Sequence, residues 1–320
     1  MAENSSDTEL KAEQRFRILV CIDRSEESYR GLRYAVRIGS GTDADITLLY
    51  VRSVDKGLRS GGLQIRMVRE NLLEWGLELP GTKTLKKGRD LLIEMGFMEE
   101  EWGGRSIHMD VQGDPLGDNM IEYSDGDGRK ITLKLMVSPT VERGILDECE
   151  MGNYNVTILS AGSSDDDDES SMFSQSIAKT VATEHRGTVI VARELEEAHG
   201  HLICVNGSPM SLEAAKKDAE IASRCFCPIH LFSVASDESE LENAKNAVAE
   251  AKAAIEEKGL VVFGEKVVVG DPVEEIVEEG RNYSLIVLSA SDIVGFRRFF
   301  QSSVAYKVLE RAHNSVMICR

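Results

Sequence analysis

The chain contains two stretches that match each other in order and spacing, and this repeat limits its fold more than any other feature. Residues 155–193 read NVTILSAGSSDDDDESSMFSQSIAKTVATEHRGTVIVAR, and residues 284–320 read SLIVLSASDIVGFRRFFQSSVAYKVLERAHNSVMICR. In these stretches LSAG corresponds to LSAS, QSIAKTV corresponds to SSVAYKV, and TVIVAR corresponds to SVMICR. Nearer the start of each copy, ILVCIDRS at 18–25 corresponds to LICVNGSP at 202–209. The sequence therefore predicts a tandem duplication.

The two copies differ in length. Asp23 pairs with Asn206 at a step of about 183 residues, whereas Ser176 pairs with Ser303 at a step of about 127, so the first copy is longer by roughly 56 residues. We predict a first domain at 16–193 with an insertion near 98–130, a charged linker at 194–200 and a second domain at 201–320. The polar residues 1–15 are expected to form a disordered tail.

Each copy alternates short apolar runs with amphipathic segments, which is typical of α/β folds. In the second copy we expect strands at 201–205, 229–234, 261–269, 285–288 and 316–319, with helices at 211–225, 237–258, 272–281 and after Ser303. Parallel strands need right-handed crossovers, so each domain is predicted to be a doubly wound sheet of five parallel strands.

The first copy follows the same order with extra material. Its strands are expected at 17–23, 46–51, 131–137, 156–160 and 188–192, and its first helices at 25–39, 63–77, 84–95 and 141–149. Asp-Gly pairs before Ile131 predict a hairpin. Either Pro115 or Pro139 could correspond to Pro272 of the second copy. Pro139 is preferred, because the helix after it leads directly into the strand at 156–160.

Charge and composition limit the function classes. The formal net charge of −18 argues against binding to nucleic acids and to anionic membranes, and we interpret the acidic surface as a source of solubility. The chain shows no signal peptide and no apolar segment of membrane length, and its six cysteines lie mostly within apolar runs. A reducing cytoplasm is therefore the expected compartment.

Candidates for metal binding and catalysis are few. Cys225-Phe226-Cys227 has no second cysteine or histidine cluster near it in the sequence, so we interpret it as a buried helix-end feature and predict no metal site. The six histidines are scattered and are interpreted as surface or strand-end residues. Ser25 and Ser208 lack a neighbouring base, which favours helix caps over nucleophiles. We predict no catalytic residue, because no P-loop or nucleophile elbow is found.

Several short motifs carry a family resemblance. They are CVNGSP, VVVGDPVEEIV, IVLSAS and SSVAYKVL in the second copy, and CIDRSEES, VSPTVERGIL, TILSAG and SQSIAKTV in the first. With these motifs, over about three quarters of its length, the chain resembles a tandem two-domain member of the universal stress protein family. The resemblance implies two domains of the adenine nucleotide alpha hydrolase-like fold. It also implies that they pair through their last strands, Thr188–Ala192 and Val316–Cys319.

Many members of that family bind ATP through a loop of the form G-x2-G-x9-G-[ST], with an acidic residue at the end of the first strand. The second copy keeps the spacing but carries Ser289, Asp292 and Ser302 at the glycine positions, Ser303 after them, and Asn206 in place of the acid. The first copy keeps an acid, Asp23, and a glycine, Gly162. Its loop runs through five carboxylates at 165–169 before a helix start placed at Ser174 to Ser176. Both loops are therefore expected to be degenerate.

These features predict a stress-response or signalling module without enzymatic activity. It would act through a protein partner that the sequence does not identify, with a homodimer left open and no nucleic acid or membrane. The alternative is a sensor of ATP or AMP with Mg²⁺. It would use Asp23, Val51, Ser160, Gly162 and Ser176 in the first copy, or Asn206, Ser289, Ser302 and Ser303 in the second. The third hypothesis is that the protein is a slow ATPase.

Overall fold

The computed structural model describes residues 15–23, 25, 28–40, 44–54, 80–112, 114–160, 169–193, 199–290 and 303–320. The predicted helix at 63–77, the acidic run at 165–168 and nearly all of the predicted tail and linker lie outside the described residues. The chain divides into two compact units. Unit 1 comprises residues 1–36 and 43–157, and unit 2 comprises residues 37–42 and 158–320. The two copies of the sequence repeat, at 16–193 and 201–320, divide the chain at a different place from the two units.

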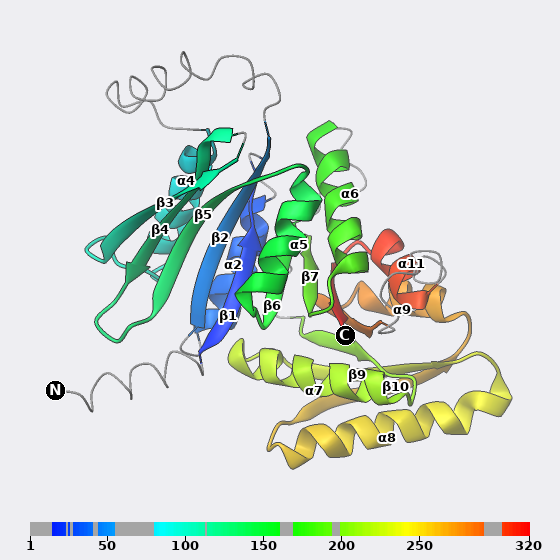
Figure 1. The fold of residues 1–320 in the computed structure, drawn as a ribbon. Coiled ribbons are helices and arrows are strands. Elements are labelled where there is room, and N and C mark those ends of the chain that lie inside the picture. The colour runs from blue at the N-terminus through cyan, green and yellow to red at the C-terminus, as the bar shows by residue number, and fades with distance from the viewer. Residues whose placement is uncertain are drawn as a thin grey trace. The chain divides into compact units, whose positions relative to one another are not determined.

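Unit 1 is built on a sheet whose strand order is β1-β2-β5-β4-β3 (Figure 1). Its elements in chain order are β1 (Phe16–Cys21), α2 (Ser28–Ser40), β2 (Ala44–Ser53), α4 (Pro80–Glu94), β3 (Gly103–Val111), β4 (Asp114–Ser124), β5 (Lys130–Ser138) and α5 (Val141–Gly152). β1, β2 and β5 are parallel to one another. In β1, Ile18, Leu19 and Val20 have no exposed surface, as expected for a parallel strand that is covered on both faces.

The insertion of the first copy forms antiparallel strands. β4 pairs antiparallel with β5, and β3 pairs antiparallel with β4. In the turn between β4 and β5, the Asp125 carboxylate accepts hydrogen bonds from the backbone N–H groups of Asp127 and Arg129, and Gly128 has a φ of +80°. The hairpin predicted from the Asp-Gly pairs is thus confirmed. α5 and then β6 (Val156–Ser160) follow β5 directly, which supports Pro139 as the counterpart of Pro272.

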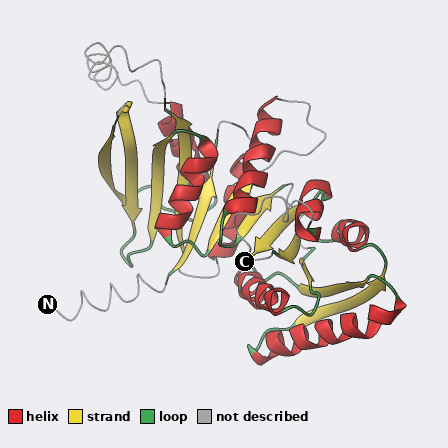
Figure 2. Ribbon diagram, turned by 45° about the vertical axis from the view of Figure 1, so that its right-hand side comes forward, coloured by secondary structure: helices red, strands yellow, loops and turns green. Residues whose placement is uncertain are grey.

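Unit 2 contains the whole second copy. Its elements after β6 are α6 (Glu169–Glu184), β7 (Val189–Ala192), β8 (His201–Cys204), α7 (Pro209–Arg224), β9 (Ile229–Ala235), the 3-10 helix η2 (Glu238–Glu240), α8 (Leu241–Glu257), β10 (Val262–Val269), α9 (Pro272–Gly280), β11 (Leu285–Ser289), α11 (Val304–Arg311) and β12 (Ser315–Cys319). In the second copy the strand order is β10-β9-β8-β11-β12, and every neighbouring pair is parallel. α7 packs beside α8, and α9 packs beside α11 (Figure 2). The predicted doubly wound five-stranded sheet is therefore confirmed for this copy.

The last strands of the two copies, β7 and β12, run side by side within unit 2. They pair antiparallel with Val316 opposite Val191, Met317 opposite Ile190, and Ile318 opposite Val189. Ile190 and Met317 are themselves counterparts in the repeat, so this pair marks a local two-fold axis between the strands.

Two arginines reinforce the pairing symmetrically. Arg193, which follows β7, is 3% exposed and donates hydrogen bonds to the carbonyl oxygens of Leu309, at 2.6 Å, and Asn314, at 3.0 Å. Its counterpart Arg320, which follows β12, donates to the carbonyl oxygens of His185 and Thr183. Each arginine thus satisfies backbone carbonyls at the carboxyl end of the other copy's last helix, α11 or α6.

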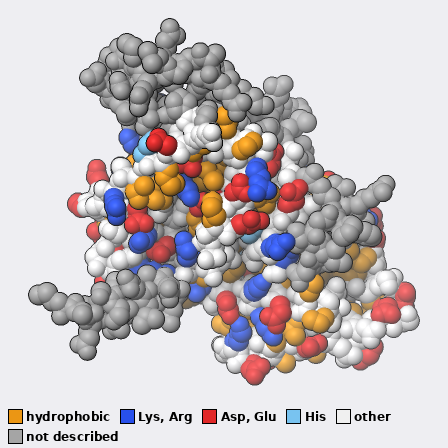
Figure 3. All heavy atoms as spheres, in the orientation of Figure 1, with side chains coloured by type: hydrophobic (Ala, Val, Ile, Leu, Met, Phe, Trp, Pro, Cys, Tyr) orange, Lys and Arg blue, Asp and Glu red, His pale blue; other side chains and the backbone are white. Residues whose placement is uncertain are grey.

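On the face drawn in Figure 3, basic and acidic side chains lie among one another. Among the described residues, no helix has both the length and the apolar character needed to cross a bilayer.

Candidate ligand-binding site

A pocket lies in the second copy at the point where the order of its strands reverses. β8 and β11 are neighbours, but the chain leaves β8 toward β9 on one side and leaves β11 toward β12 on the other. The loops after the two strands therefore diverge and leave a crevice at the carboxyl edge of the sheet, where open α/β sheets bind ligands. The cavity here has a volume of about 170 Å³.

The lining of this pocket is largely apolar. It consists of Cys204, Val205, Asn206, Phe232, Val234, Pro272, Ile276, Leu288, Ser289, Val304 and Ala305. Sites that enclose a whole drug-sized molecule measure roughly 300–1,000 Å³. The present cavity is smaller, so it admits one ring-sized group, and the rest of any larger ligand must lie outside it.

Asn206 is an exposed residue at the border of the pocket and shapes the turn after β8. Its side-chain oxygen accepts hydrogen bonds from the backbone N–H of Ser208, at 3.1 Å, and from the Ser208 hydroxyl, at 2.7 Å. Ser208 in turn caps α7, because its hydroxyl oxygen accepts from the N–H of Ser211 at 3.2 Å. The predicted cap is confirmed. With the oxygen so engaged, the side-chain NH₂ is the part of Asn206 that can donate to a ligand.

The first copy builds the same turn with an acid. The Asp23 carboxylate accepts from the Ser25 N–H at 2.8 Å and from the Ser25 hydroxyl at 2.5 Å, and the Ser25 hydroxyl oxygen accepts from the N–H of Ser28. Asp23 and Asn206 thus make the same hydrogen bonds at the same position of their copies, as the repeat predicted. The difference is electrostatic, because the second copy has lost the negative charge at this position.

Two other elements, β11 and α11, contribute to the pocket. Ser289 is the last residue of β11 and lines the cavity. Ser303 caps α11, with its hydroxyl oxygen accepting from the N–H of Tyr306 at 3.2 Å. The next two residues, Val304 and Ala305, line the cavity, so the first turn of α11 faces it. Two of the four residues predicted for the second copy, Asn206 and Ser289, thus line the cavity, Ser303 directly precedes the lining residue Val304, and Ser302 lies outside the described residues.

The residues predicted for the first copy are divided between the two units. Asp23 and Val51 belong to unit 1, Ser160 and Ser176 belong to unit 2, and Gly162 lies outside the described residues. Val51 is 8% exposed on β2, and Ser160 is the last residue of β6.

The position of Ser176 is a correction. The sequence analysis placed it at a helix start, but α6 already begins at Glu169, so Ser176 lies well inside the helix and is exposed. The physical reason is that local pattern alone does not fix where a helix begins, because most of a helix's stability comes from how it packs in the fold. The end of the acidic run is therefore part of α6.

Several pocket residues escaped the sequence analysis, notably Phe232 and Val234 on β9 and Ile276 on α9. One signal for them was available. The repeat step of about 183 that links Asp23 to Asn206 also links Val51 to Val234. Ile276 gave no comparable signal, because which face of a helix meets the pocket depends on how the helix packs.

The lining offers few reactive groups among the described residues. Burial raises the pKa of the Cys204 thiol well above its ordinary value, so the thiol stays protonated and unreactive at neutral pH. Among the described residues that line the pocket there is no histidine, acid or lysine. At this pocket the described residues also offer no group of three histidine, cysteine or acidic side chains close enough to hold a metal ion.

Comparison with known proteins gives consistent matches. A family model described as "Universal stress protein family" matches residues 15–76 and 201–320. A universal stress protein structure from Archaeoglobus fulgidus DSM 4304 is similar with a TM-score of 0.59 at 16% identity, covering 95% of this chain and 96% of that chain. A putative universal stress protein from Pseudomonas aeruginosa UCBPP-PA14 gives 0.58 at 12% identity, covering 97% and 94%. Among curated proteins no significant match was found.

Proposed function

The chain belongs to the universal stress protein family, and on that premise we propose that it is a non-enzymatic stress-response module whose second copy binds a small ligand through one planar aromatic ring. Adenine nucleotides are the ligand class that the family resemblance suggests. The observation that carries the proposal is the cavity of about 170 Å³ between the carboxyl ends of β8 and β11.

The shape and polarity of the cavity favour a ring over a charged group. Phe232 is 1% exposed and Val205 is 4% exposed, so the inner wall is dry and apolar. Polar groups stand at the border of the cavity, where the Asn206 NH₂ and the Ser289 hydroxyl can select the edge of a ring by hydrogen bonds. The first turn of α11 faces the cavity, and the positive end of its helix dipole would attract an anionic tail of the ligand.

The same residues argue against catalysis. Phosphate hydrolysis by general-base catalysis needs a group that accepts a proton from water, and an amide such as that of Asn206 cannot accept a proton at neutral pH. Ser303 already accepts a backbone hydrogen bond as a helix cap. The pocket is therefore suited to sense a ligand without changing it.

The test is thermal unfolding of the purified chain with adenosine, AMP or ATP, each with and without Mg²⁺. A ligand that binds only the folded protein at a hundred times its Kd stabilises it by about 2.7 kcal/mol, which raises Tm measurably. Val304→Trp should abolish the shift, because residue 304 lies at the exposed border of the pocket and a larger side chain there closes it. Val261→Trp is the matched control, since Val261 is 63% exposed and does not line the cavity.

Three results would contradict the proposal. The first is an unchanged Tm with every adenine ligand, combined with mass spectra showing no ligand released from the denatured protein. The second is an equal shift in the Val304→Trp variant, which would place the ligand elsewhere. The third is phosphate release from ATP that falls in Ser303→Ala, which would favour an ATPase.

A further inference from the structure

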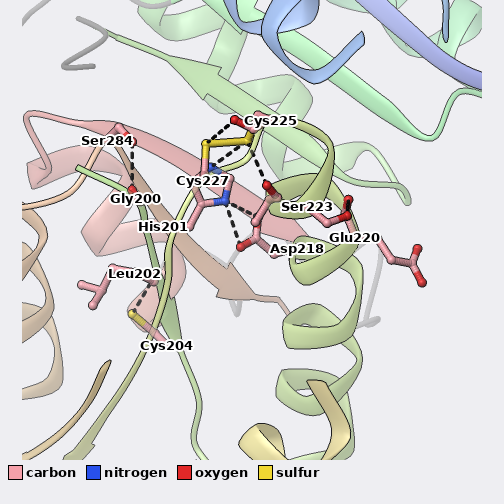
Figure 4. Close-up of polar contacts among 11 residues, drawn as sticks. Gly200, His201, Leu202, Cys204, Asp218, Glu220, Ser223, Cys225, Cys227 and Ser284 are labelled. Carbon is pink, nitrogen blue, oxygen red and sulfur yellow. Dashed lines mark hydrogen bonds and ion pairs between the residues drawn. A yellow bond between two sulfur atoms is a disulfide. The ribbon is translucent and has the colours of Figure 1, made fainter. Parts of the chain in front are cut away.

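A second group of chemically active side chains lies at the opposite edge of the same sheet, where β8 begins. His201 is the first residue of β8, Asp218 lies on α7, and Cys225 and Cys227 lie in the turn between α7 and β9. All four are buried, with exposures of 2% for His201, 0% for Asp218 and 8% for each cysteine. Figure 4 shows the His201 ring between Asp218 on one side and the two cysteines on the other.

The contact with Asp218 determines how His201 is protonated. Its Nδ1 atom lies 2.9 Å and 3.0 Å from the two carboxylate oxygens of Asp218. An ionised carboxylate can only accept, so Nδ1 carries the proton and donates it. In the neutral ring, Nε2 then presents its lone pair, and it lies 3.9 Å from Cys225 Sγ. A carboxylate that orients a histidine in this way is the usual second partner of a metal-binding imidazole.

The turn directs both sulfurs inward. The backbone N–H of Cys225 donates to the Ile221 carbonyl oxygen, and that of Cys227 donates to the Ala222 carbonyl oxygen, which anchors both residues to the end of α7. Phe226 between them has a φ of +53° and is 87% exposed. A bulky residue with positive φ is a genuine outlier that persists only where the surroundings impose it. Here the turn places Phe226 in solvent and both cysteines beside His201.

We propose that, when Cys225 and Cys227 are reduced, they and His201 Nε2 bind one soft divalent cation of the Zn²⁺ class, with Asp218 as the orienting carboxylate. The three ligand atoms already lie within 4.8 Å of one another. Two sulfurs bound tetrahedrally to zinc at about 2.3 Å are roughly 3.8 Å apart, so only small side-chain movements are needed. Two thiolates and an imidazole select Zn²⁺ or Co²⁺ over Mg²⁺ and Ca²⁺, and the fourth position stays open for water.

The two cysteines form a disulfide in this structure, so the site exists in two exclusive states. Two thiols of a reductant supply two electrons and two protons, become a disulfide themselves and leave Cys225 and Cys227 as thiols. Binding of the cation then displaces the two thiol protons. In the reverse direction a disulfide oxidant accepts the two electrons by thiol–disulfide exchange and leaves as two thiolates, which releases the cation and restores the Cys225–Cys227 disulfide. The sequence pattern predicted no metal site here. His201 and Asp218 lie near the cysteines only in the folded chain, so the pattern could not indicate the cluster.

The test is a titration of the full-length protein with Co²⁺ as a spectroscopic probe, followed by Zn²⁺. One sample is reduced under anaerobic conditions with a phosphine, which opens the disulfide with one water and leaves as the phosphine oxide. The other sample keeps its disulfide. We expect thiolate-to-cobalt charge-transfer absorption and tetrahedral d–d bands that saturate at one Co²⁺ per chain in the reduced sample, vanish on adding Zn²⁺, and do not arise in the oxidised sample.

Variants test the individual roles. Cys225→Ser and Cys227→Ser should each lose the charge-transfer band, whereas Cys21→Ser, which changes a free thiol outside the cluster, should keep it. Asp218→Asn should retain the band but weaken affinity about 10–100-fold, as expected for an orienting group. The proposal is overturned if the reduced wild-type protein shows no Co²⁺ bands, or if the bands persist in both folded cysteine variants. The comparison of reduced with oxidised wild type decides the matter even if a variant fails to fold.

Discussion

At the residue scale, His185 shows how one ring can make stability depend on pH. It lies half-buried just after α6 and its carbonyl oxygen accepts a hydrogen bond from Arg320. Burial, together with the nearby positive charge of Arg320, lowers the pKa of the imidazole from 6.5 to about 4. The folded protein therefore holds this ring neutral where the unfolded chain would protonate it.

The sign of the effect follows by linkage. The unfolded chain takes up a proton near pH 6.5 and the folded protein only near pH 4, so stability is complete above pH 6.5 and falls between these values. We expect a loss of about 1–2 kcal/mol across this window, after allowing for the screening of a half-buried ring by water. Urea unfolding at pH 7, 5.5 and 4.5 measures it. His185→Gln, which keeps the backbone contact to Arg320, should lose less stability over the same range. Equal slopes for the two proteins would refute this account.

Single residues at strand ends were well predicted. Asp23, Asn206 and Ser289 each follow a run of apolar residues, and the repeat identifies the first two as counterparts, so their location needed no tertiary information. Asn206 and Ser289 do border a cavity together. Residues after a long loop were harder, because nothing local fixes where the following helix begins. Ser176 is the example.

At the element scale, the end of α5 depends on a residue with left-handed backbone geometry. Asn153 terminates the helix with φ 48° and ψ 50°. Two residues later, the Asn155 side chain accepts a hydrogen bond from the backbone N–H of Arg17 on β1 at 2.8 Å. The chain can make this contact only if it leaves α5 in the direction that the left-handed residue provides.

Asn153 therefore allows a matched pair of substitutions. Asn153→Ala should lower the free energy of unfolding by about 1 kcal/mol, because a Cβ-bearing residue without a compensating polar group is disfavoured in this region. Asn153→Gly should be close to neutral, since glycine adopts positive φ freely. Chemical denaturation of both variants measures the difference. If alanine and glycine have equal effects, the backbone conformation is not what stabilises the end of the helix.

Elements were predictable where local pattern and tertiary role agree. β11 and β12 are apolar on both faces because both are buried, and the runs 285–288 and 316–319 identified them nearly residue for residue. The β4–β5 hairpin was evident from Asp-Gly pairs. β3 was not, since its side chains are largely exposed and its pattern resembles that of a loop. Its strand character comes from pairing with β4, which is a tertiary effect.

At the scale of the whole molecule, two arginines connect the two copies of the repeat. Arg193 is buried, and burial lowers its pKa to about 10, which leaves it charged at neutral pH. It satisfies two carbonyl oxygens in and after α11, and a 3.2 Å ion pair between Lys179 and Glu310 joins α6 to α11 nearby.

Replacing the two arginines one at a time tests their roles. Arg193→Met should cost about 2–4 kcal/mol, because methionine fills the space but leaves two buried carbonyl groups unpaired. Arg320→Met should cost about 1 kcal/mol, because water can replace the arginine at its less buried position. Denaturant unfolding gives both values. A smaller loss for Arg193→Met than for Arg320→Met would contradict the assignment.

The antiparallel pairing of β7 with β12 has a consequence for how this protein can diverge. In a homodimer with a two-fold axis, every inherited substitution changes both sides of the interface together. Here β7 and β12 are encoded at separate places in one chain, so the sequence of one side can change while that of the other stays the same. The copies show the result, since only the first holds Asp23 and the β3–β4 ribbon, and only the second holds Asn206 and the Cys-Phe-Cys turn. Fusion into one chain thus allows a lineage to specialise one half and conserve the other.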